Sequence, residues 1–165
     1  MTMTPIHMHA HGFGTAASGL VIALHTSSVC LPSPLAGRLV DRFGGTVMSV
    51  VAAGVLLAAG VVAALAPGHS LTLIAFALVL LGVGWSSGLV TGTAIVTDST
   101  PLATRAKVQG LVDVAIAVAG AVGGLAFGIV AAATSDPILA ALCGTLAFAA
   151  APAAVIAARK SSVRA

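Results

Sequence analysis

Five long apolar stretches dominate this chain, and they determine the solvent in which it can fold. Each is about as long as the 20 residues that a helix needs to cross the hydrocarbon core of a bilayer. Only 7% of the 165 residues are charged and 59% are hydrophobic, so a water-soluble domain would lack the polar surface to cover its core. Polar and apolar residues do not alternate as they would in a lipid-facing β-barrel. The sequence therefore predicts an all-α membrane protein with five transmembrane helices, at 16–36, 47–66, 71–96, 108–133 and 137–158.

The basic residues predict how these helices are oriented. All 7 Lys and Arg residues follow the first, third and fifth predicted spans, whereas the turns at 67–70 and 134–136 carry none. Because Lys and Arg collect in cytoplasmic loops, we expect residues 1–15 to form an extracytoplasmic lead segment containing histidines, and residues 159–165 to form a basic cytoplasmic tail. Scattered charges of this kind form no stripe that would bind nucleic acid. The basic residues are Arg38, Arg42, Arg105, Lys107, Arg159, Lys160 and Arg164.

Polarity differs among the predicted spans. Spans two and five are almost wholly apolar and are predicted to face lipid, whereas polar side chains predict that spans one, three and four face protein or a water-filled cavity. His25 and Asp113 are candidates for contact with substrate or for proton coupling. Alternatively, His25 donates one structural hydrogen bond, and Asp113 lies shallow enough to be satisfied by Gln109, Lys107 and water. The candidate interior polar residues are His25, Trp85, Ser86, Ser87, Gln109 and Asp113.

Glycines recur at every fourth position in spans three and four. Small residues at this spacing let helix backbones approach closely, so we expect these positions to pack against neighbouring helices. Asp113 precedes Gly120 and Gly124 by about two and three helical turns, which places its carboxylate on the same face and predicts that it points inward. The glycines concerned are Gly84, Gly88, Gly92, Gly120, Gly124 and Gly128.

The break after span one, residues 37–46, reads as a cytoplasmic turn of glycine, three residues, Asp-Arg, one residue and glycine. This pattern resembles the loop motif of the major facilitator superfamily, and it is matched by Gly37, Asp41, Arg42 and Gly44. We refer to these four residues as the gate motif. The basic pair that usually follows is replaced by a glycine and a threonine, which suits the family's weaker second copy, between helices eight and nine.

The resemblance implies that Asp41 caps a neighbouring helix and pairs with basic groups to hold a cytoplasmic gate shut. Asp41 could instead be a simple cap in a turn. Asp98 and Arg105 are candidate partners of the gate motif, and a solvated interfacial charge is the alternative for Asp98.

Residues 3–9 and 19–25 are also similar to bacterial members of this superfamily, so the five spans resemble helices eight to twelve, a partial bundle from the C-terminal half. The resemblance implies secondary active transport of an unknown small solute across a bacterial plasma membrane. Because the family's substrate path lies between two helical bundles, we expect the chain to be inactive without the missing half and to bind that half or itself within the lipid bilayer.

Two other functions remain open at this point. The chain could be a membrane subunit or packing module that does not transport, or a metal-binding membrane protein that uses His7, His9 and His11 of the lead segment. An enzyme is not expected, because the sequence contains no glycine-rich phosphate loop, no GxSxG and no HExxH. No cofactor is expected either.

Overall fold

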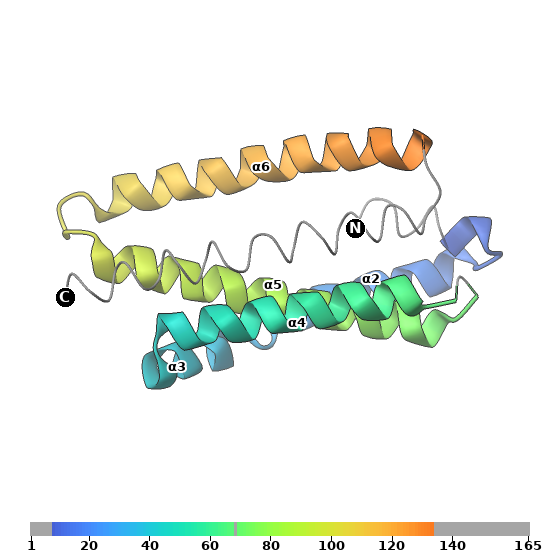
Figure 1. Ribbon diagram of the computed structural model, residues 1–165, viewed down its shortest axis with the longest axis horizontal. Coiled ribbons are helices and arrows are strands. Elements are labelled where there is room, and N and C mark those ends of the chain that lie inside the picture. The colour runs from blue at the N-terminus through green and yellow to red at the C-terminus, as the bar shows by residue number, and fades with distance from the viewer. Residues whose placement is uncertain (1–7, 68, 134–165) are drawn as a thin grey trace.

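The computed structural model describes residues 8–67 and 69–133, and the regular elements in those ranges are helices that run side by side along the long axis (Figure 1). The fifth predicted span at 137–158, the basic tail at 159–165 and His7 lie outside the described residues. The helices are α2 (Thr15–Cys30), α3 (Ser33–Phe43), α4 (Gly45–Leu65), α5 (Leu71–Ser99) and α6 (Arg105–Ala133).

Four segments are long and apolar enough to cross a membrane, judged by length and composition, and they overlap the first four predicted spans. These segments are Thr15–Phe43, Gly45–Leu65, Leu71–Ser99 and Arg105–Ala126.

Proline ends two of the helices. Ala66 before Pro67 and Thr100 before Pro101 are extended, with ψ of 123° and 129°, because a proline ring clashes with a helical residue before it.

The first span departs from the prediction. Residues 37–46 were expected to form a turn, but α3 continues as far as Phe43, and the chain turns at Gly44 with φ of +82°. The helical break lies earlier, between Cys30 and Ser33, where Pro32 and Pro34 cannot donate backbone hydrogen bonds. Helix α3 persists beyond the break because it is amphipathic, with Ala36 and Val40 buried one turn apart and the charged residues exposed.

Helix α5 lies at the centre of the described helices and contacts α2, α3, α4 and α6. Where α2 meets α5, the buried side chains of Met8, Val21 and Leu78 form a small core. On another face of α5, helix α4 contributes the buried residues Met48, Ala52 and Ala59.

This arrangement corrects the predicted role of span two. Span two, now α4, was expected to face lipid on nearly all sides, yet it packs closely along α5. Span four was expected to be interior; among the described residues the window Arg105–Ala126 has no buried residue, and its interior position stays a prediction because the predicted fifth span lies outside those residues. Small residues explain why span two packs against α5, because alanine and glycine on α4 and α5 let the two backbones approach closely. The number of polar residues in a span does not by itself determine which helix it contacts.

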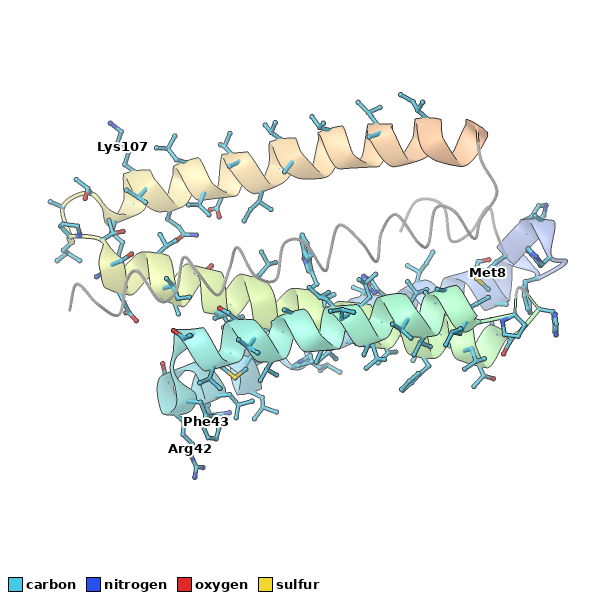
Figure 2. The ribbon with its side chains drawn as sticks, in the orientation of Figure 1. Met8, Arg42, Phe43 and Lys107 are labelled. Atoms are coloured by element: carbon cyan, nitrogen blue, oxygen red, sulfur yellow. The ribbon has the colours of Figure 1, made fainter. Side chains whose placement is uncertain are left out.

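The described basic residues lie at one end of the helices. Figure 2 places Arg42 and Lys107 at the same end and Met8 at the opposite end. The sequence assigns Arg38 to α3 and Arg105 to the first residue of α6, near Arg42 and Lys107 respectively. The described part of the chain thus has a basic end and an end without Lys or Arg, and which end faces the cytoplasm stays a prediction.

Candidate functional site

The gate motif lies at the end of α3 and presents its charges outward. Asp41 and Arg42 are both exposed, and the Arg42 guanidinium carbon lies 5.4 Å from the centroid of the Phe43 ring, within the range of a cation–π contact. The Gly44 amide donates to the Val40 carbonyl at 2.8 Å and ends the helix. Gly37, Asp41 and Arg42 are therefore positioned by a helix, and Gly44 alone forms the sharp turn.

The predicted partners of the motif do not meet it within the described chain. Among residues 8–67 and 69–133, Asp41, Arg42, Asp98 and Arg105 form no ion pair with one another. Arg105 is half-buried, and its Nε atom has no hydrogen-bond acceptor. The pairing of Asp41 with basic groups stays a prediction.

His25 joins α2 to α5. Its Nδ1 atom lies 2.7 Å from the carbonyl oxygen of Leu78, and since a carbonyl only accepts, Nδ1 carries the hydrogen and donates it. The other ring nitrogen of a neutral histidine is then an acceptor. This geometry agrees with the structural hydrogen bond that was the alternative role for His25.

A close approach of α2 and α5 lies one turn from that bond. A Cβ atom built at Gly82 would collide with the Ser28 hydroxyl and lie 2.9 Å from the His25 carbonyl oxygen, while the Ser28 hydroxyl itself donates to that carbonyl at 2.7 Å. The sequence reasoning missed Gly82 because it lies outside the series of glycines at every fourth position.

A second polar contact joins α5 to α3. The hydroxyl oxygens of Ser33 and Ser86 are 2.9 Å apart, and Ser86 is only 2% exposed. Trp85, the preceding residue, is 49% exposed, and Ser87 is half-buried. Of the three predicted polar residues on α5, Ser86 is therefore buried between helices and Trp85 lies on the surface of the described chain.

Asp113 does not point into a packed interior among the described residues. It is exposed and accepts a hydrogen bond from Gln109 Nε2 at 3.2 Å, while Gln109 Oε1 is buried without a partner. Among the described residues, no atom beyond the helix's own backbone lies within 4 Å of a Cβ built at Gly120 or Gly124. Val108 and Val112 are half-buried at the start of α6, and they lie roughly 140° and 100° around the helix from Asp113.

The glycines of α5 pack against α4 over part of the predicted series. A Cβ at Gly84 would lie 2.9 Å from Leu56 Cγ, and one at Gly88 would lie 4.0 Å from Ala52 Cβ. Gly92 has no described atom within 4 Å of such a Cβ. Gly128, near the end of α6, is half-buried.

The described residues do not assemble a metal site in the lead segment. His9 and His11 are exposed, and His7 is not described. Within residues 8–67 and 69–133, no group of three or more His, Cys, Asp or Glu side chains is placed to hold a metal ion. The metal-binding alternative therefore gains no support from this part of the chain.

Comparison with known proteins gives the following relatives. The sequence model described as Major Facilitator Superfamily matches residues 1–164. The chain is 56% identical over 139 residues to the uncharacterized MFS-type transporter YddS of Bacillus subtilis, an alignment that covers 84% of this chain and 32% of YddS. It is 51% identical over 146 residues to the uncharacterized MFS-type transporter YdeG of the same organism, covering 88% of this chain and 34% of YdeG.

A more distant relative is the riboflavin transporter RfnT of Brucella anthropi, which is 36% identical over 113 residues, covering 68% of this chain and 28% of RfnT. The chain spans about a third of the length of these curated relatives.

Proposed function

The chain belongs to the major facilitator superfamily, and we propose that it supplies part of the membrane domain of a secondary active transporter for a small solute. The family is one of membrane transporters and not of enzymes, and the relatives are bacterial. The observation that carries the proposal is the family match, which extends over residues 1–164 and includes the gate motif. The rest of the substrate path would come from a second bundle.

Within such a transporter, we assign the chain to helices eight to twelve of the C-terminal half. The gate motif without its following basic pair supports this assignment. The location of Arg42 and Lys107 at one end supports an orientation in which that end faces the cytoplasm and the end near Met8 faces outward. The membrane would then be a bacterial plasma membrane.

The gate motif acts in this proposal as one side of a cytoplasmic closure. Asp41 and Arg42 are exposed at the end of α3, where their charged groups are accessible to another part of the transporter. In the closed state, the Asp41 carboxylate would accept hydrogen bonds from a helix N-terminus or a basic group, an arrangement favoured by the helix dipole. Arg105 and Asp98 would supply further charges at the same end.

The substrate path would use polar groups on α2, α5 and α6. Trp85 is exposed on α5, and the acceptor nitrogen of His25 and the carboxylate of Asp113 are the candidates for binding a proton. An ionisable group inside a membrane is costly unless it serves such a role or finds partners.

A chimera tests this proposal. In YddS, this chain replaces the segment of 139 aligned residues, and uptake is measured for a solute that native YddS carries, identified from a labelled panel that includes riboflavin. We expect energised vesicles with the chimera to take up that solute, and we expect an uncoupler to stop the uptake. A chimera that is inserted and elutes as a single species, yet transports no more than vesicles without it, contradicts the proposal.

The gate motif is tested in the same chimera with Asp41→Asn, which keeps the shape of the side chain and removes its charge. Uptake should fall while membrane insertion stays the same. The matched control is Ser49→Ala on α4, where the hydroxyl donates only to the Gly45 carbonyl of its own helix, at 2.8 Å, and uptake should not change. Unchanged uptake in Asp41→Asn would reduce the motif to a turn.

A further inference from the structure

The break between α2 and α3 lacks hydrogen bonds that a continuous helix would have. Because Pro32 and Pro34 have no amide hydrogen, the carbonyl groups of Ser28 and Cys30 cannot accept the usual bond from the residue four positions on. The two helices therefore end at Cys30 and begin again at Ser33. The backbone alone connects the two halves of this span less firmly than it connects the residues within either helix.

A chain of two hydroxyl groups bridges this break. The Ser33 hydroxyl donates to the Val29 carbonyl at 3.0 Å and also lies 2.9 Å from the Ser86 hydroxyl. A hydroxyl has one hydrogen, and that of Ser33 is directed to Val29, so Ser86 is the donor to Ser33. Ser86 is 2% exposed, and the contact is therefore shielded from competing groups. It links α5 through α3 to the last turn of α2.

The two halves of the span are held on α5 in different ways. On the α2 side, the His25–Leu78 hydrogen bond of 2.7 Å and the close contact at Gly82 fix the helix. On the α3 side, the small apolar residues Ala36 and Val40 are buried. Among the described residues, the serine pair is the only side-chain hydrogen bond between α3 and α5.

We propose that the Ser33–Ser86 pair is a latch that sets the position of α3. When the latch opens, α3 and its gate residues turn about the break at Pro32, while α2 stays fixed on α5. Ser86 is then a positioning residue that acts on the gate through Ser33 and touches no substrate. The inference rests on the proposed gate function of α3, although the movement itself can be measured without transport.

Spin labels measure this movement in the full chain, with both native cysteines, Cys30 and Cys143, changed to serine. One label pair is attached at Arg38 of α3 and Val61 of α4, and the reference pair is attached at Leu20 of α2 and Val61. All three label positions are exposed. Labelled chain is diluted with unlabelled chain in liposomes, so that only distances within one molecule are recorded.

Interhelical hydrogen bonds in a membrane average about 0.6 kcal/mol and reach about 1.7, so Ser86→Ala should raise the ratio of displaced to latched α3 by roughly 3-fold to 18-fold. The α3–α4 distances should shift, and the α2–α4 distances should not. Ser33→Ala should give at least as large a shift, because it also removes the bond to the Val29 carbonyl, and the double variant should add nothing beyond Ser33→Ala, because Ser86 then has no bond left to lose. Ser49→Ala on α4 is the control and should leave both distributions unchanged.

Three results would overturn the latch: unchanged α3–α4 distances in Ser86→Ala, an equal shift in Ser49→Ala, or an equal shift of the α2 reference pair, since the last would indicate general loosening. Uptake by the YddS chimera distinguishes a wrong latch proposal from a wrong gate proposal. If Ser86→Ala moves α3 but leaves uptake unchanged, the latch stands and the gate function of α3 is refuted.

Discussion

A methyl group at position 82 tests the close contact between α2 and α5. In Gly82→Ala, the new Cβ atom would meet the Ser28 hydroxyl and lie 2.9 Å from the His25 carbonyl oxygen and 3.1 Å from Ser28 Cβ. The serine side chain can rotate away, but the carbonyl belongs to the backbone of α2 and cannot. The two helices must therefore separate, and the separation stretches the neighbouring His25–Leu78 hydrogen bond of 2.7 Å.

The change in the free energy of unfolding of Gly82→Ala has two destabilising contributions and one stabilising contribution. Inserting a methyl group into a packed contact costs about 1–3 kcal/mol, and a lost interhelical hydrogen bond costs about 0.6 kcal/mol more. Replacing glycine by alanine inside a helix returns about 0.5–1 kcal/mol, because the unfolded chain loses conformational freedom. We expect the free energy of unfolding of Gly82→Ala to be lower than that of the wild type by about 1–3 kcal/mol.

Gly92→Ala is the matched control, on the same helix and with the same chemical change. No described atom lies within 4 Å of a Cβ at position 92, so the substitution should be neutral or stabilising by up to about 1 kcal/mol. The assay is equilibrium unfolding of the full chain in mixed micelles, followed by the fluorescence of its single tryptophan. If Gly82→Ala proves as stable as Gly92→Ala, the close approach of α2 and α5 is wrong.

Other substitutions and fusions test the His25–Leu78 hydrogen bond and the orientation of the chain in the membrane. His25→Ala should lower the free energy of unfolding by about 0.6–1.7 kcal/mol in the same assay, while Thr26→Ala, which loses only a bond to the Ile22 carbonyl of its own helix at 3.0 Å, should have a smaller effect. Reporter domains fused after residue 105 should be cytoplasmic and those fused after residue 68 should be outside, and the reverse pattern would overturn the orientation.

Hydropathy was sufficient to predict where the first four spans lie. Lipid requires about 20 apolar residues and an internally bonded backbone, and these requirements can be recognised in one sequence. The end of the first span could not be predicted in the same way. Gly37 looks like a helix breaker, but the burial of Ala36 and Val40 keeps that segment helical, and within residues 37–46 only Gly44 adopts a positive φ.

The contacts between helices were harder to predict than the helices. The spacing of Gly84 and Gly88 indicated positions that contact another helix, but it could not indicate that their neighbours are Leu56 and Ala52 of an apolar span that was expected to face lipid. The acceptor for His25 is a backbone carbonyl, which every residue carries, so no sequence pattern marks it. Asp113 shares a helical face with Gly120, but periodicity alone does not tell which face meets a neighbour.

The serine latch illustrates the same limit. Pro32 and Pro34 mark the break in the sequence, and the polarity of Ser86 marked it as an interior residue. The pairing of Ser86 with Ser33 depends on how α3 crosses α5, which only the three-dimensional arrangement reveals.

The central claim is that this chain forms one part of a transport path, and reconstitution tests it most directly. Liposomes containing only this chain are compared with liposomes in which the chain is co-expressed with YddS lacking its 139 aligned residues. We expect no saturable uptake by the chain alone, which should be self-associated, and uptake when the two parts are combined. Saturable uptake by the chain alone, together with a monomeric mass in detergent, would contradict the account.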